Sequence, residues 1–280
     1  MTRNQALQSF RQELHISHNQ IFTYLNCSLK YRLHYIEGRP MEKVSVALPF
    51  GSAIHSAIEM FYRALKNRGT CEPVNAIMER FETCFELEIE NQQAPIIYKK
   101  ETPDRKSAIE MGKAMLKVFH ETNTVKPEQI VDIELPLSAR LYKENGETTD
   151  FLLVGIIDLL LVDDHQEILI VDNKTASKSM AQSTADDDNQ MTAYSYLLAS
   201  NKFVFPTAPV NCRFDVLKKL KAPTFEHVST VRTADQRKRF AKLASSVLNA
   251  IDAGIFIPQS SWMCSDCGFV SACKTWHSRS

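Results

Sequence analysis

The chain contains 280 residues, and its 44% content of hydrophobic residues is enough to bury a sizeable core and excludes a disordered protein. Lys plus Arg and Asp plus Glu both number 33, so the formal net charge is zero and any site for a polyanion must be local. No apolar run has the length of a membrane-spanning helix, and residues 1–15 lack the apolar segment of a signal peptide, which predicts a cytoplasmic protein without membrane contact.

Residues 1–125 are predicted to be mainly helical. The first helical segment, 17–36, opens with the capping-box pair Ser17 and Gln20 and contains Cys27, which alone is more typical of a small core residue than of a metal ligand. A second segment carries His55, which alone is more typical of a hydrogen-bonded structural histidine. Apolar side chains recur at helical spacing over 17–36, 50–66, 73–91 and 105–122.

A group of basic residues lies between the third and fourth helical segments. It consists of Lys99, Lys100, Arg105 and Lys106. Such a patch could follow a phosphate backbone, although a solvated loop is the more common explanation. The sequence leaves both interpretations open.

Two apolar runs joined by a short polar turn predict a β-hairpin over residues 151–172. Asp158 lies inside the first run, where a carboxylate costs several kcal/mol to desolvate unless it meets a cation. At the end of the second run Asp172 and Lys174 are two residues apart, so they project from the same face of the strand, about 7 Å apart. Two acids and a lysine therefore converge at one end of the hairpin.

These hairpin residues have the chemistry that phosphodiester cleavage needs. That reaction requires hard ligands for a divalent metal ion, an activated water, and positive charge that meets the negative charge developing on the phosphate. Asp158 and Asp172 suit the metal, the main-chain carbonyl of Asn173 adds an oxygen, and Lys174 can orient or deprotonate the water. On these residues alone, an internal Asp–Lys salt bridge is an equally good explanation.

Segments on both sides of the hairpin add candidate site residues. The strand 129–142 carries Glu134, an acid that we expect near the hairpin carboxylates. The helix 189–200 places Gln190 and Tyr194 on one face at i, i+4 spacing. Further strands are predicted at 210–217 and 227–231, followed by a helix that begins at Thr233 and runs to about residue 253.

Three cysteines close to the C-terminus have the spacing of metal ligands. Cys264 and Cys267 form a C-x-x-C pair, Cys273 follows, and Cys27 is the candidate for the fourth ligand. A zinc site of three cysteines and His277 is an alternative, as is simple packing. A cluster that joins Cys27 to the tail would close a very long loop and so stabilise the fold.

Taken together, the motifs resemble the PD-(D/E)XK nuclease superfamily, and within it the RecB-like exonuclease branch that carries an iron–sulphur cluster. The resemblance extends over nearly the whole chain, because five elements occur in the expected order. They are Gly51-Ser-Ala-Ile-His55, Gly155-Ile-Ile-Asp158, Asp172-Asn173-Lys174, Gln190-Met-Thr-Ala-Tyr194, and the frame of one early cysteine, Cys27, and the late Cys264, Cys267 and Cys273.

The resemblance implies roles for the metal-site residues. His55, Asp158, Asp172 and the Asn173 main-chain carbonyl would bind Mg²⁺ or Mn²⁺. Lys174 would be the catalytic lysine, acting together with Asp158 and Asp172.

The remaining motif residues would bind the substrate and an iron–sulphur cluster. Gln190 and Tyr194 would position the substrate phosphate and the lysine. A 4Fe–4S cluster, with structural Zn²⁺ as the alternative, would be bound by Cys27, Cys264, Cys267 and Cys273.

The resemblance also implies a fold and an activity. We expect an α/β fold with a restriction-endonuclease-like core, a central mixed sheet flanked by helices, in three integrated parts: helical residues 1–125, a nuclease core over 126–254 and a cysteine-rich tail over 255–280. The expected activity is metal-dependent exonuclease cleavage of DNA ends, with single-stranded DNA as the preferred substrate. The alternative is a nuclease-derived module that binds DNA or a partner without cutting. Relatives act in repair, recombination, phage replication and CRISPR adaptation, so helicases and adaptation proteins are candidate partners.

Overall fold

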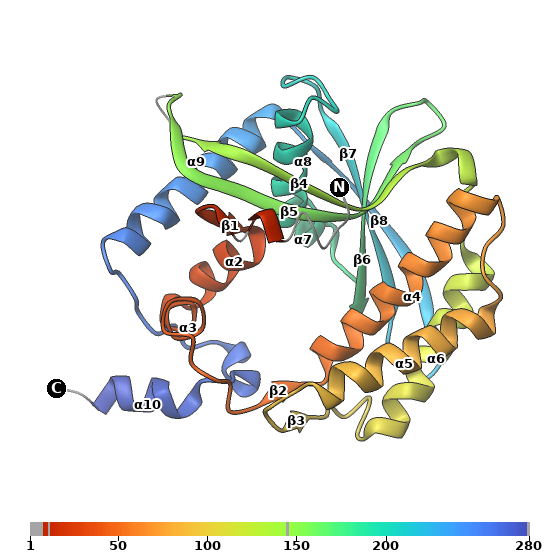
Figure 1. Ribbon diagram of the computed structural model, residues 1–280, viewed down its shortest axis with the longest axis horizontal. Helices are drawn as coiled ribbons and strands as arrows, with labels where there is room; N and C mark the ends of the chain where they lie inside the picture. The colour runs from red at the N-terminus through yellow and green to blue at the C-terminus, as the bar shows by residue number, and fades with distance from the viewer. Residues whose placement is uncertain (1–7, 11, 144–145, 279–280) are drawn as a thin grey trace.

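The computed structural model describes residues 8–10, 12–143 and 146–278, and it shows a mixed β-sheet with helices packed on both faces (Figure 1). This architecture confirms the predicted α/β class with a central mixed sheet. Part of the segment examined for a signal peptide, residues 1–7 and 11, lies outside the described residues. Within the described ranges no helix combines the length and the apolar composition needed to cross a membrane.

The sheet is built around the predicted hairpin. Antiparallel pairs join β4 to β5, β5 to β6 and β7 to β8, whereas β1 runs parallel to β5 and β6 runs parallel to β7. The long apolar runs of β5 and β6 suit these central positions, where both faces of a strand are covered. The strands are β1 (His15–Ser17), β4 (Ile130–Tyr142), β5 (Thr148–Val162), β6 (Ile168–Ala176), β7 (Val210–Lys218) and β8 (Thr224–Arg232).

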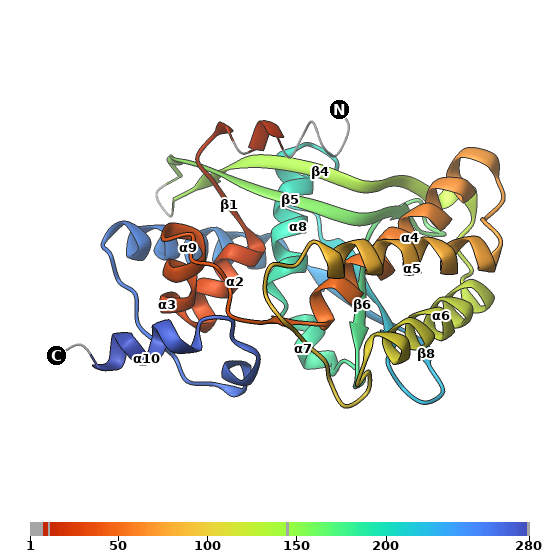
Figure 2. The same cartoon turned by 60° about the horizontal axis from the view of Figure 1, so that its bottom comes forward.

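Two hydrophobic cores lie on the two faces of this sheet. Three mutually packed helices cover one face and include the predicted segments at 50–66, 73–91 and 105–122, observed as α4 (Ala47–Arg68), α5 (Val74–Glu90) and α6 (Arg105–Thr122). The other face is covered by α2 (His18–Asn26), α8 (Asn189–Ser200) and α9 (Ala234–Asp252), and the short α7 (Gln182–Asp186) precedes α8. Figure 2 shows α4, α5 and α6 together at one end and α2 and α9 at the other.

The contact between α5 and α6 depends on Gly112. A methyl group at this position would lie 2.0 Å from the Phe81 ring, so only a residue without a side chain fits. We expect Gly112→Ala to lower the free energy of unfolding by roughly 1–3 kcal/mol, as overpacking of a core does. Gly51 in α4 faces open space, so Gly51→Ala is the control and should raise that free energy by up to about 1 kcal/mol. Urea denaturation of both variants measures the difference, and equal stabilities would contradict this account of the contact.

The prediction of one continuous helix over 17–36 is wrong at Cys27. Cys27 has extended backbone angles, which end α2 and begin α3 (Ser28–Tyr31), followed by a π-helical turn, η1 (Arg32–Ile36). The cause is a tertiary contact, because the Ser28 hydroxyl and the Leu29 N–H both bond to the main chain of Ile257. These bonds replace intrahelical partners and set the C-terminal segment beside α3.

The tail lies against the N-terminal part of the chain. It contains η3 (Trp262–Asp266) and α10 (Val270–Ser278), which Figures 1 and 2 both show beside α3 and the short strand β2 (Val44–Ser45), itself paired with β3 (Ile96–Ile97). Glu42 fastens the two parts, since its N–H donates to Gly268 and its carboxylate accepts from Ser271 at 2.9 Å. Residues more than two hundred positions apart in sequence are thus in direct contact.

The basic patch between α5 and α6 is largely neutralised by acids. Lys99 pairs with Asp266, and Arg105 pairs with Glu86 at 2.9 Å. Three of its four members therefore have acidic partners, because Lys106 lies 4.0 Å from Glu110 on the same helix. This favours a structural and solvated role over a phosphate-binding one.

Candidate active site

An opening in the sheet lies at the motif that ends in Asp158. β5 pairs with β4 along one of its edges. Its other edge is divided between two strands, since β1 pairs with residues 152–154 and β6 pairs with residues 159–162. Between them, in the described part of the chain, residues 155–158 have no strand partner on that edge. We call these four residues the open edge of β5. Main-chain and side-chain groups of the neighbouring strand ends can approach it directly.

The first group at the open edge comes from β6. The pairing of Leu159 with Val171 is the last of the β5–β6 ladder, so Asp158 and Asp172 stand where the two strands separate. Asp158 compensates for the lost ladder bond, since its Oδ2 accepts the N–H of Asn173 at 2.8 Å. The predicted hairpin is therefore confirmed, and its acids lie at the point where it opens.

Glu134 and Asp158 lie opposite each other, at the point where the side chains of β4 and β5 exchange the faces of the sheet to which they point. We call this exchange a local inversion. The register is unbroken on both sides of this pair, from Ile133 with Leu159 to Leu135 with Ile157. Nevertheless, Ile133 and Leu159 enter the core under α4, whereas Leu135 and Ile157 enter the core under α8. Glu134 has φ of 52°, a left-handed conformation that costs a non-glycine residue about 1 kcal/mol or more. The inversion interrupts the normal side-to-side alternation at the two acids.

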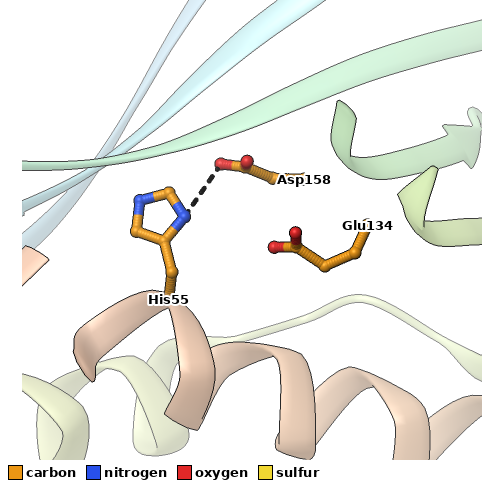
Figure 3. A group of neighbouring side chains, drawn as sticks. All are labelled: His55, Glu134 and Asp158. Carbon is orange, nitrogen blue, oxygen red and sulfur yellow. Dashed lines mark ion pairs between the residues drawn. The ribbon is translucent and has the colours of Figure 1, made fainter. Parts of the chain in front are cut away.

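The third member of this group comes from α4. His55 Nδ1 lies 3.4 Å from Asp158 Oδ2, and a potential ligand atom of Glu134 completes a set of three that all lie within 4.8 Å of one another. Figure 3 shows the imidazole on α4 pointing toward the two carboxylates. Burial lowers the pKa of His55, against the opposing effects of Asp172 and Glu134, so the ring is neutral at pH 7. A neutral imidazole is the form that binds a metal ion.

Asp172 and Lys174 form a second network on the α8 side. Lys174 Nζ lies 2.7 Å from Asp172 Oδ2 and donates to Gln190 Oε1 at 2.7 Å. Gln190 in turn donates from Nε2 to Asp172 Oδ1 at 2.7 Å and to the Tyr194 hydroxyl at 2.8 Å. The Gln190 amide thus holds both Asp172 and Lys174 in place. These three predicted residues and Tyr194 therefore lie together.

The glycine of the open edge explains how α8 reaches this network. A methyl group on Gly155 would lie 2.8 Å from Leu197 and 3.3 Å from the Tyr194 ring, so the helix rests almost directly on the strand. Tyr194 is buried there, and burial raises the pKa of its hydroxyl well above the usual value, which keeps it protonated. Close packing therefore sets the reach of Gln190, one turn earlier on α8.

Lys174 remains charged in this setting. Burial acts to lower its pKa, but the carboxylates of Asp172, Asp158 and Asp188 outweigh burial, and the net shift is upward. Without a bound metal ion the site therefore holds an ammonium group beside three acids. Such a group can neutralise an incoming phosphate.

The donor set suits a hard divalent cation. It offers an imidazole and two carboxylates at mutual distances below 4.8 Å, and His55 also bonds to the main chain of Asn173. Asp172 is not part of this group of three, and its Oδ2 lies 2.7 Å from Lys174 Nζ. Carboxylate oxygens are the ligands that Mg²⁺ and Mn²⁺ prefer.

Comparison with known proteins identifies the family. A family model described as the PD-(D/E)XK nuclease superfamily matches residues 15–274. The chain belongs to this superfamily. No curated protein matches it significantly. The superfamily assignment therefore comes from the family model, which spans the active-site residues described above.

One solved structure supports the fold. A crystal structure of a candidate exonuclease from Eubacterium rectale superposes with a TM-score of 0.58 at 11% identity, covering 100% of this chain and 94% of the other. SSO0001 gives a TM-score of 0.32 at 12% identity, covering 89% and 94%. Rai1 from Candida albicans, in complex with pU5 and Mn²⁺, gives 0.26 at 12% identity, covering 84% and 68%. The last two scores are too low to bear on the fold of this nuclease-superfamily chain.

The four predicted cluster cysteines lie in one region of this superfamily member. Cys27, Cys267 and Cys273 pack around a small apolar cluster that includes Leu29 and Phe269. Burial raises the pKa of the Cys273 thiol, and the neighbouring Cys27, Cys267 and Cys264 thiols raise it further. The remaining cysteines lie elsewhere: Cys212 is in the β7 core, and Cys71 and Cys84 are on or near α5.

Sequence reasoning missed one candidate ligand and one neighbour of the lysine. Glu134 was expected near the hairpin acids, but its place among the potential ligand atoms depends on the inversion at φ of 52°, which has no sequence signature. His18 is not among the predicted site residues, although the charges of Asp172 and Lys174 both affect the pKa of its imidazole. Only the register of β1 on β5 could have revealed it.

Proposed function

We propose that this chain is a metal-dependent deoxyribonuclease of the RecB-like exonuclease type. The observation that carries the proposal is the convergence of His55, Glu134 and Asp158 beside the paired Asp172 and Lys174, all at the open edge of β5. Hard ligands next to a charged lysine are what phosphodiester hydrolysis requires. Membership of a nuclease superfamily supports the same chemistry.

Each residue has a role that follows from its position. His55, Glu134 and Asp158 would hold Mg²⁺ or Mn²⁺, with Asp172 and the Asn173 carbonyl adjacent. When bound, such an ion supplies Lewis-acid polarisation of the phosphate and lowers the pKa of water.

The α8 side of the site would handle the substrate. The raised pKa of Lys174 favours an ammonium that orients the attacking water and stabilises negative charge, rather than a free base. Gln190 would hold the lysine in place and, with Tyr194, contact the substrate phosphate.

DNA with a free end is the proposed substrate. The candidate exonuclease from Eubacterium rectale shares the fold, and the sequence motifs resemble those of relatives that act on DNA ends. Single-stranded DNA is the preferred form within this proposal. Partners that separate the two strands of duplex DNA, such as helicases, would supply the single-stranded substrate.

A direct assay tests the proposal. Purified protein is incubated with end-labelled single-stranded, double-stranded and circular single-stranded DNA, with Mg²⁺, with Mn²⁺ or with EDTA. We expect processive shortening of linear single strands, slower cutting of duplex, intact circles, and no cleavage in EDTA. Cleavage of circles would replace the exonuclease assignment by an endonuclease. DNA binding without any metal-dependent cleavage would favour a non-cutting module.

We further propose that Cys27, Cys264, Cys267 and Cys273 bind a 4Fe–4S cluster. Their gathering where the C-terminal tail meets α3 supports it. A single structural Zn²⁺ ion held by these cysteines is the alternative.

Cys273→Ser tests the cluster. Anaerobically purified wild-type protein is expected to be coloured and to contain about four iron and four sulphide ions per chain. The variant should lose both and unfold at a lower temperature, because the link between Cys27 and the tail is gone. Cys71→Ser, at an exposed thiol, is the control and should keep the colour. Colourless wild-type protein with one zinc ion per chain would overturn the assignment.

A further inference from the structure

His18 is the first residue of α2 and follows directly on β1, level with the open edge of β5. β1 runs parallel to β5 with Ser17 level with Val154, so the next residue, His18, reaches the level of Gly155. From the other direction, the β6 register brings Lys174 to the level of the same open edge. The end of β1 and the end of the D-x-K motif therefore approach each other across this opening.

The surroundings of His18 place it beside the Asp172–Lys174 network. Burial lowers the pKa of its imidazole, Asp188 and Asp172 oppose that shift, and Lys174 adds to it. Asp188 caps the first turn of α8, and α2 packs on that helix. The charged groups that face His18 therefore come from β6 and from the start of α8.

The polar atoms of the His18 ring are not all used by the fold. Its Nδ1 is buried and has no hydrogen-bond partner of good geometry among the described residues, although the ring also interacts with the Asn19 side chain. The other face of the ring packs against Phe22, one turn later on α2, with ring centroids 6.0 Å apart and a tilt of 38°. Buried nitrogen atoms without partners are uncommon in folded proteins, and at a functional site they indicate a group waiting for a ligand.

The ligand that fits is a phosphate. Asp172 and Asp188 disfavour a further anion close to them, but Lys174 provides compensating charge, and a neutral imidazole supplies an N–H donor. A metal ion fits less well, because the group of potential ligand atoms is centred on His55, Glu134 and Asp158 and does not include His18.

Resting on the nuclease function proposed above, we propose that His18 is a further catalytic residue, whose Nδ1 donates a hydrogen bond to a non-bridging oxygen of the phosphate that is cleaved. A metal ion bound by the ligands on the α4 side would hold the phosphate from one side, and His18 and Lys174 would hold it from the α2 and α8 side. Phe22 fixes the ring so that the donor is preorganised.

Three substitutions at His18 give a position-specific test. An asparagine amide nitrogen lies close to the position of Nδ1, whereas a glutamine amide reaches the position of Nε2. We expect His18→Ala to lower kcat/KM for single-stranded DNA by roughly 10- to 100-fold, mainly through kcat, as for loss of a donor to a charged group. His18→Asn should recover most of that loss, and His18→Gln should not.

Controls separate this role from folding and from metal binding. His15→Ala removes a histidine whose Nδ1 lies 2.9 Å from the Glu13 carbonyl, away from the site, and should leave kcat/KM within about twofold of wild type. The Mn²⁺ concentration for half-maximal cleavage should be the same for wild type and the His18 variants, because no metal ligand has changed. A shifted Mn²⁺ requirement would overturn the phosphate contact and indicate a metal ligand.

The outcomes distinguish this inference from the proposed function. If wild-type protein cleaves DNA and His18→Ala cleaves equally well, the nuclease function stands and the role of His18 is wrong. Equal rates for His18→Asn and His18→Gln would also overturn it, because the recovery would not depend on the Nδ1 position. If wild-type protein shows no metal-dependent cleavage, both proposals fail.

Discussion

Lys174→Ala is expected to lower the rate of metal-dependent DNA cleavage by roughly 10²- to 10⁴-fold, the range for loss of a group that handles protons or charge in the transition state. The ammonium lies 2.7 Å from Asp172 and is held by Gln190, so alanine leaves nothing that could replace it. Binding of single-stranded DNA should weaken far less, because one charge among many contacts is removed. Single-turnover cleavage and fluorescence anisotropy measure the two effects.

Lys178→Ala is the matched control. Lys178 lies four positions later in sequence, just beyond the end of β6, with an exposed side chain. We expect its cleavage rate to match that of wild type within about twofold. If Lys174→Ala cut DNA at the wild-type rate, the D-x-K network would have no part in catalysis. Thermal unfolding of both variants shows whether the loss is chemical or structural.

Glu134→Gln is expected to have the next largest effect. The substitution keeps the size of the side chain and removes one negative charge from the set that includes His55 and Asp158. Loss of one anionic ligand should lower cleavage in Mg²⁺ by about 10²-fold or more and raise the metal concentration for half-maximal rate. Raising the Mn²⁺ concentration should restore part of the rate, since Mn²⁺ binds such sites more readily.

Glu128→Gln provides the comparison for Glu134. Glu128 is exposed and lies in η2 (Pro127–Gln129), just before β4. The Glu128→Gln variant should cleave DNA at the wild-type rate at every metal concentration. A normal Mg²⁺ requirement for Glu134→Gln would remove Glu134 from the metal site and leave the strained backbone at this position without a functional explanation.

Most of the sheet and the α8 side of the site could be predicted from sequence, because their signals are local. The apolar runs around Asp158 and before Asp172 predict a hairpin wherever they fold, and strand parity sets Asp172 and Lys174 on one face. Helical spacing likewise places Gln190 next to Tyr194. Each of these two relations joins residues that are only a few positions apart in the sequence.

The rest depends on contacts between distant segments. The break at Cys27 arises from bonds between Ser28 and Ile257, which no local pattern records. Glu134 joins the metal ligands only through an inversion shared by two strands, and His18 comes near Lys174 only because β1 and β6 use the same edge of β5. Sequence periodicity predicts elements, but it does not predict which strand ends meet.

We expect a divalent metal ion to bind at His55, Glu134 and Asp158. Titration of Mn²⁺ into the protein, followed by the electron paramagnetic resonance signal of free Mn²⁺, measures this most directly. The account predicts that wild-type protein and Lys174→Ala withdraw Mn²⁺ from solution, whereas Asp158→Asn binds it at least about tenfold more weakly. Equal Mn²⁺ binding by wild type and Asp158→Asn would contradict it.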